Sequence, residues 1–171
     1  MKIAMQAAER HVLNVIVDNE PGILAKITGM FTARGYNIDS LTVADISEDH
    51  AISRITIVTN GPEPVIDQIR AQLERLVPVH KVIDLTESGA HVERELALVK
   101  VSGKGDSRVE ALRLADAFRA TVIDANVEHF IFEITGRTSK IEQFIAIMAP
   151  LGLVEVCRTG VAAMSRGGEG M

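Results

Sequence analysis

The sequence predicts an α+β fold made of two tandem βαββαβ units, and three observations support this prediction. Short apolar stretches typical of strands alternate with apolar stripes that have helical spacing. The same order of elements occurs twice along the 171 residues, although the two halves share little sequence identity. A polar break at residues 86–93, TESGAHVE, separates the two occurrences and is typical of a short linker.

The first unit is expected to contain four strands and two helices. Its strands are predicted at 12–17, 38–46, 52–59 and 79–85. The first helix follows the turn NEPG at 19–22, because the fixed φ of Pro21 suits the first position of a helix. It ends at Gly35, a residue type that often terminates helices. The second helix opens after the NGP turn at 60–62 and ends before Pro78.

The second unit repeats this order. Its strands are predicted at 96–101, 121–125, 129–135 and 153–157. Each of its helices starts with a capping-box pattern, which consists of Ser107 with Glu110 and of Ser139 with Glu142. The apolar stripe of the first of these helices is predicted to comprise Val109, Leu112, Ala115 and Phe118.

We therefore expect five segments along the chain. They are an N-terminal extension at 1–10, a first domain at 11–86, a linker at 87–94, a second domain at 95–160 and a flexible tail at 161–171. A βαββαβ unit of this size is the ferredoxin-like arrangement, an antiparallel sheet with two helices on one face. The strand at 38–46 has few polar positions, so we expect it to meet another domain or, more simply, a second copy of the chain.

Composition and charge narrow the classes of partner. The net charge is −5 and neither half is basic, which argues against DNA or RNA. The apolar runs are far shorter than a membrane helix requires, and residues 1–11 do not resemble a secretion signal. The single cysteine, Cys157, excludes an internal disulfide and is expected to be a small buried hydrophobe in the last strand. These points favour the cytoplasm.

The stretch from 19 to 40 carries the clearest functional signal. Gly22 has no side chain to shield the first backbone N–H groups of the predicted helix, and those groups and the helix dipole attract a carboxylate. Asn19 and Asn37 can add neutral hydrogen bonds. The turn fits a small amino acid and contains no residue typical of a catalyst. A well-capped helix packed on a sheet is the commoner explanation of the spacing alone.

Other patterns give weaker indications of a phosphate, metal or catalytic site. The stretch Gly103-Lys104-Gly105 lacks the spacing of a phosphate-binding loop and fits a glycine turn better. None of the five histidines forms an i, i+4 pair, so a zinc site is not expected. No Ser/His/Asp or Cys/His set is grouped in the sequence, so no catalytic residue is predicted. Arg34 and Arg54 are interpreted as surface cations.

Four blocks of the sequence together resemble one family. They are NEPGILAKITGMFTARGYNIDSLTVA at 19–44, ISRITIVT at 52–59, QLERLVPVHKVIDL at 72–85 and AHVERELALVKV at 90–101. The first block resembles the start of an ACT domain, the amino-acid-sensing version of the ferredoxin-like fold. All four, in this order and at this total length, are similar to the small regulatory subunit of acetolactate synthase (acetohydroxyacid synthase).

This resemblance implies a regulatory chain without chemistry of its own. The family's small subunit binds and activates a large catalytic subunit, which uses thiamine diphosphate, Mg²⁺ and FAD to join pyruvate to pyruvate or 2-oxobutanoate. It also confers feedback inhibition by valine or a related branched-chain amino acid. We therefore expect no cofactor and no metal on this chain, and a homodimer that holds valine between two ACT domains.

The resemblance also implies which positions hold the effector. Matched position by position, the valine-binding residues are Asn19, Gly22, Ile23, Leu24, Asn37 and Ile38. Ala25 stands where many members have Ser, which bears on the strength of inhibition.

Two alternatives remain open at this point. A free-standing ACT-type sensor could act on another partner, although neither a nucleic-acid surface nor an output domain is visible in the sequence. An enzyme on this scaffold would need a group of titratable residues in a cleft, which the sequence does not indicate. Binding to a large catalytic subunit would distinguish the regulatory-subunit interpretation from both alternatives.

Overall fold

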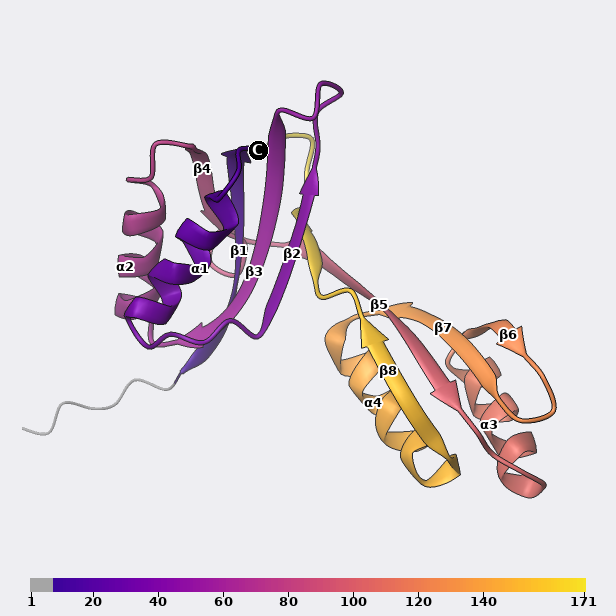
Figure 1. Cartoon of the computed structure of the whole chain (residues 1–171). Coiled ribbons are helices and arrows are strands. Elements are labelled where there is room, and N and C mark those ends of the chain that lie inside the picture. Colours follow the sequence, from indigo (N-terminus) through magenta and orange to yellow (C-terminus); the bar gives the residue numbers. More distant parts are fainter. Residues whose placement is uncertain (1–7) are drawn as a thin grey trace, which may run out of the picture. The chain divides into compact units, whose positions relative to one another are not determined.

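The structure is a computed structural model that describes residues 8–171 (Figure 1). The chain divides into two compact units: residues up to Val92 together with Val161–Met171 form the first unit, and Glu93–Gly160 form the second. The extension predicted at 1–10 lies largely outside the described residues, and a strand begins at Glu9. Each unit has an antiparallel sheet with two helices on one face, which confirms the predicted fold class.

The first unit contains six of the predicted elements. They are β1 (Glu9–Asp18), α1 (Ile23–Ala33), β2 (Ser40–Asp45), β3 (Ile52–Gly61), α2 (Glu63–Leu73) and β4 (Val79–Asp84). The strands lie in the order β2-β3-β1-β4 and all neighbours are antiparallel. Leu13 and Val15 of β1 alternate toward the helices and are fully buried against Ile27 of α1 and Leu73 of α2. The strand β2 is left at one edge of the sheet.

The second unit has the same topology. Its elements are β5 (His91–Val101), α3 (Asp106–Ala117), β6 (Thr121–Ala125), β7 (Phe130–Gly136), α4 (Thr138–Met148), a 3₁₀ turn (Ala149–Leu151) and β8 (Leu153–Arg158). The strand order is β6-β7-β5-β8. Glu95 of β5 is buried and accepts two hydrogen bonds from the Arg158 guanidinium of β8, at 2.5 and 2.9 Å, which raise the pKa of Arg158.

The predicted stripe of α3 is wrong in part. Val109 and Leu112 are 59% and 39% exposed, whereas Ala111 and Ala115 are buried. The core beneath α3 is occupied by aromatic rings, with Phe132 and Phe144 in edge-to-face contact at 6.1 Å between centroids. These rings fill the volume, so the helix turns its small alanines inward.

The predicted helix starts also need correction. Helix α1 begins at Ile23 and not at Pro21, because Gly22 precedes it with a left-handed φ of +87°. Neither predicted capping box caps a helix: α3 and α4 begin one residue before Ser107 and Ser139, and no side chain bonds to either N-terminus. The first residues of α3 and α4 are instead determined by the turns that follow β5 and β7. Gly35, at φ +69°, ends α1 as predicted.

The segment predicted as a flexible tail contains an additional strand, β9 (Ala162–Ser165), which pairs with β5. Val161 and Ala163 are buried against Val12, Val58 and Leu85, on the face of the first sheet that the helices leave open. The polar composition of 161–171 predicts a flexible tail, but the contacts of Val161 and Ala163 with distant apolar residues hold this segment against the sheet. The predicted linker is correspondingly shorter, since β5 begins at His91.

A buried hydrogen-bond network attaches this segment to the sheet. The side-chain N–H of Asn14 donates to the Ala163 carbonyl at 2.9 Å, and the Thr56 hydroxyl donates to Asn14 Oδ1 at 2.8 Å. Asn14 and Thr56 are 1% and 3% exposed. The Val161 N–H also donates to the Ser40 hydroxyl at 2.8 Å. The last residues are therefore part of the first unit.

The expectation that Cys157 is buried is wrong. This residue lies in β8 opposite Leu98, and its side chain is exposed. Strand β8 is an edge of the second sheet; Val156 packs against the core beneath α3 and α4, so the next residue, Cys157, lies on the opposite face.

Replacing Asn14 with Ala should destabilise the first unit by about 1–3 kcal/mol, because the substitution leaves the buried Ala163 carbonyl and Thr56 hydroxyl without partners. Urea unfolding of the full chain measures this change. The control is Asn60→Ala, which alters an exposed asparagine bonded to Asp39 and should change stability by less than about 0.5 kcal/mol. Equal effects of the two substitutions would contradict the role assigned to the network.

Candidate ligand site at the start of helix α1

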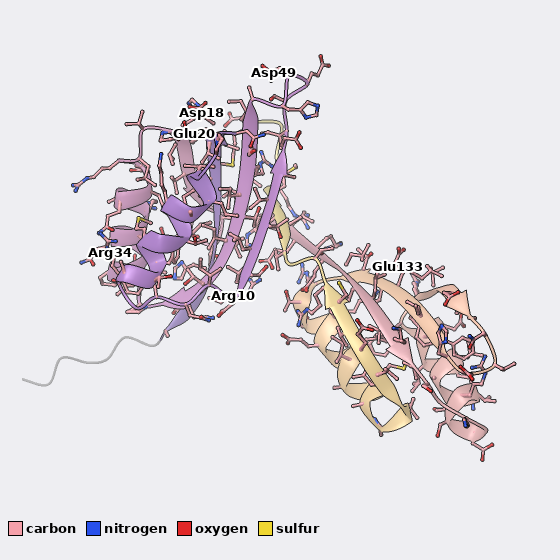
Figure 2. All side chains as sticks on the ribbon, viewed as in Figure 1. Arg10, Asp18, Glu20, Arg34, Asp49 and Glu133 are labelled. Atoms are coloured by element: carbon pink, nitrogen blue, oxygen red, sulfur yellow. The ribbon has the colours of Figure 1, made fainter. Side chains whose placement is uncertain are left out.

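The turn between β1 and α1 is held by backbone hydrogen bonds. The Asn19 N–H donates to the Ala51 carbonyl at 2.7 Å, and the Glu20 N–H donates to the Asp18 carbonyl at 2.9 Å. The Ile23 N–H donates to the Glu20 carbonyl at 3.3 Å. Figure 2 shows Asp18 and Glu20 at the end of the first unit that also carries Asp49, in the hairpin between β2 and β3. The turn is thus fixed to this hairpin.

Three backbone donors of this turn remain available. Among the described residues, no acceptor receives a hydrogen bond from the N–H groups of Gly22, Leu24 or Ala25. The first turn of α1 contains no acidic residue, and the carboxylate of Glu20, just before the helix, is paired with Lys26 at 3.1 Å. A Cβ placed on Gly22 would meet nothing within 4 Å, so the approach to these groups is open. This geometry suits a carboxylate ligand.

The Asn19 side chain adds an acceptor beside these donors. Its Nδ2 donates to the His50 carbonyl at 2.8 Å, which fixes the amide and leaves Oδ1 free to accept from an ammonium group. The hydrogen bond from His50 lowers the pKa of Asp45, and hydrogen bonds from Ser47 and the Ala51 N–H lower the pKa of Asp49. With Glu48 the hairpin carries three carboxylates, one of them paired with His50, and this negative charge favours a cation on this side of the turn.

The two apolar residues of the turn have different environments. Ile23 is only 6% exposed and packs in the core, so its side chain is not available to a ligand. Leu24 is 39% exposed and is available. The sequence groups these neighbours together, but one helical step rotates the side chain by about 100° and separates core from surface.

The remaining two predicted residues lie at the other end of α1. Asn37 and Ile38 precede β2, near the end of the unit where Figure 2 places Arg34. Helix α1 has 11 residues and separates the two groups by about 16 Å. Asn37 Nδ2 donates to Asp39 at 2.7 Å, so its Oδ1, like that of Asn19, is free to accept. One copy of the chain therefore does not bring the six residues together.

The other sequence candidates have structural explanations. A Cβ on Gly103 would lie 2.8 Å from the Leu151 carbonyl oxygen, so close packing requires glycine, in agreement with a glycine turn. Arg34 is exposed and donates to the Met30 carbonyl at 3.2 Å, whereas Arg54 is half-buried in β3. Across residues 8–171, no helix is both long and apolar enough to cross a membrane.

Two protein families match the chain, one for each unit. Residues 13–81 match the family described as the AHAS small subunit-like ACT domain. Residues 94–167 match the family described as the small subunit of acetolactate synthase. The two matches lie in the order, and at the positions, of the two βαββαβ units.

Individual proteins match over nearly their whole length. The probable acetolactate synthase small subunit of Archaeoglobus fulgidus is 42% identical over 160 residues, which cover 94% of this chain and 99% of that protein. The acetolactate synthase isozyme 3 small subunit of Escherichia coli is 43% identical over 159 residues, 92% of this chain and 96% of that protein.

A solved structure agrees with both units. The crystal structure of the acetolactate synthase small subunit from Thermotoga maritima superimposes with a TM-score of 0.85 at 38% identity, and covers 94% of this chain and 99% of that one. With these matches, the chain belongs to the family of acetolactate synthase small subunits.

Proposed function

We propose that this chain activates the large catalytic subunit of acetolactate synthase and makes it sensitive to valine bound between two first units. The observation that carries the proposal is the set of free backbone donors at Gly22, Leu24 and Ala25, beside the free Oδ1 of Asn19. Thiamine diphosphate, Mg²⁺ and FAD would reside on the large subunit, in the cytoplasm. This chain would supply regulation and no catalytic group.

Each part of valine has a counterpart in this arrangement. The carboxylate accepts from the N–H groups at the start of α1, where the helix dipole adds to the attraction. The ammonium donates to Asn19 Oδ1 of one copy and to Asn37 Oδ1 of a second copy. Leu24 of one copy and Ile38 of the other enclose the isopropyl group. One methylene more or less changes the binding free energy by only about 0.8 kcal/mol, so discrimination against leucine and isoleucine is modest.

The edge strand β2 explains how two copies complete the site. Among the described strands, β2 pairs only with β3, and two apolar residues, Val43 in β2 and Ile46 just after it, are 43% and 52% exposed. Antiparallel pairing of β2 with its copy across a two-fold axis sets the start of one strand beside the end of the other. Asn37 and Ile38 of one copy then approach the turn at Asn19 and Gly22 of the other, and two equivalent sites form.

Mixing the full chain with the large catalytic subunit tests the proposal directly. Acetolactate formation from pyruvate should rise on mixing, and valine should reverse the rise only when this chain is present. Activity assays with the large subunit alone, with and without valine, are the control. Absence of both activation and valine sensitivity would favour a sensor for another partner.

Substituting Gly22 with Asp should weaken valine binding at least about tenfold while activation persists. A new carboxylate would repel that of the ligand, and two like charges about 4 Å apart repel by about 4 kcal/mol at an effective dielectric constant of ~20. Calorimetric titration with valine measures the loss.

Two matched variants separate charge from backbone strain in this test. Gly22→Asn introduces the same shape without the charge, and asparagine tolerates a left-handed φ. Gly105→Asp introduces the same charge at an exposed glycine with positive φ in the second unit, outside both halves of the proposed site. Valine binding that is lost equally in all three variants would contradict the proposed seat.

Replacing Val43 with Lys should convert the dimer to a monomer at micromolar concentration and weaken valine binding with it. The two effects are linked, because a ligand that bridges two copies tightens their association and is tightened by it. Sedimentation velocity with and without valine measures both. Val77→Lys is the control, since Val77 is 95% exposed in the turn before β4. A wild-type chain that stays monomeric with saturating valine would contradict the model of a shared site.

A further inference from the structure

A buried histidine–carboxylate pair lies in the first unit, away from the start of α1. His11 of β1 and Asp84 at the end of β4 are each 3% exposed, and His11 Nδ1 lies 2.7 Å from Asp84 Oδ2. Glu87 follows three residues later, and one ligand atom from each of the three residues lies within 4.8 Å of the others. The spacing of the histidines along the sequence gives no sign of this cluster, because 73 residues separate His11 from Asp84.

The bonding of His11 is incomplete. Its second nitrogen, Nε2, is buried and has no hydrogen-bond partner among the described residues. A buried polar atom without a partner costs about 1–3 kcal/mol, so such atoms usually indicate a missing ligand or water. Asp84 is better satisfied, because Oδ1 accepts the Thr86 N–H at 2.9 Å. The imidazole thus has one nitrogen bonded to Asp84 and one without a partner among the described residues.

The cluster can be reached from solvent. A hollow of about 450 Å³ on this side of the first unit is lined by Asp84 and Glu87, and also by Arg70, Glu74 and Ser88. Arg70 donates to Glu87 at 3.3 Å and, with its other terminal nitrogen, to Asp67 at 2.9 Å. If an ion displaced Arg70 from Glu87, the guanidinium would keep its bond to Asp67. The hollow therefore borders the two carboxylate residues of the cluster, and the contact of Arg70 with Glu87 is replaceable.

We infer that His11, Asp84 and Glu87 form a binding site for a divalent first-row transition metal ion such as Zn²⁺. One imidazole nitrogen with two carboxylate oxygens suits such ions, whereas Ca²⁺ and Mg²⁺ prefer oxygen ligands alone. Water entering from the hollow completes the coordination shell. In this arrangement the ion replaces the hydrogen bond between His11 Nδ1 and Asp84 Oδ2 and binds both atoms. The ion would connect β1, the end of β4 and the segment that leads into β5.

Calorimetry with Zn²⁺ and absorption spectroscopy with Co²⁺ test the inference on the full, tag-free chain after treatment with a chelator. We expect one ion per chain, a Co²⁺ spectrum typical of mixed nitrogen and oxygen ligands, and a higher thermal midpoint. Glu87→Gln should weaken Zn²⁺ binding at least about tenfold and leave the fold intact, because the Glu87 side chain is 34% exposed. His11→Gln should abolish binding, but this substitution also alters a buried residue.

The control is His80→Gln, which removes another histidine paired with a carboxylate. His80 lies 2.6 Å from Asp18, and both side chains are about half exposed. This variant should bind Zn²⁺ as the wild type does. No binding at micromolar Zn²⁺, equal binding by Glu87→Gln, or an equal loss in His80→Gln would each overturn the inference. Because valine binding is measured separately, these outcomes are independent of the proposed regulatory function.

Discussion

The left-handed backbone at Gly22 is the constraint on which the candidate site depends. It turns the chain from β1 into α1 and leaves three N–H groups without acceptors among residues 8–171. A helix that satisfied these groups with a capping side chain would be more stable and would have no place for an anion. The bond from Asn19 to the β2–β3 hairpin then fixes the turn to the sheet. The turn therefore lacks the stabilisation that a capping side chain would give.

The two units share a topology, but they differ in whether the sheet face opposite the helices is covered. In the first unit, Val161 and Ala163 cover Val12 and Val58, and the Asn14 side chain donates a hydrogen bond to the Ala163 carbonyl. In the second unit, the corresponding face carries the exposed Cys157. The edge strands of the first sheet are β2 and β4, and pairing with a second copy is proposed at β2. Repetition of a fold within one chain has thus not produced two equivalent surfaces.

Much of the fold can be predicted from sequence periodicity, because the residues on the buried face of a strand or helix are apolar and recur with the period of that element. The order of elements, the glycine at the end of α1 and the turn at 19–22 are all local patterns. The errors concern features decided by distant residues. The phase of α3 depends on Phe132 and Phe144, and the order of 161–165 depends on β1 and β3. The approach of His11 to Asp84, which no local pattern indicates, likewise depends on strand pairing. The six residues of the candidate site were grouped by resemblance, and the structure separates them into two half-sites.

The first unit is discontinuous along the chain, since residues 93–160 are inserted between β4 and the segment that closes its second face. During synthesis, the inserted unit leaves the ribosome complete, while Val12, Val58 and Leu85 still await residues 161–165. The unit that begins translation is thus the last to be finished. Until then its apolar surface must be protected from neighbouring chains, and a chain cut short before residue 161 keeps that surface open.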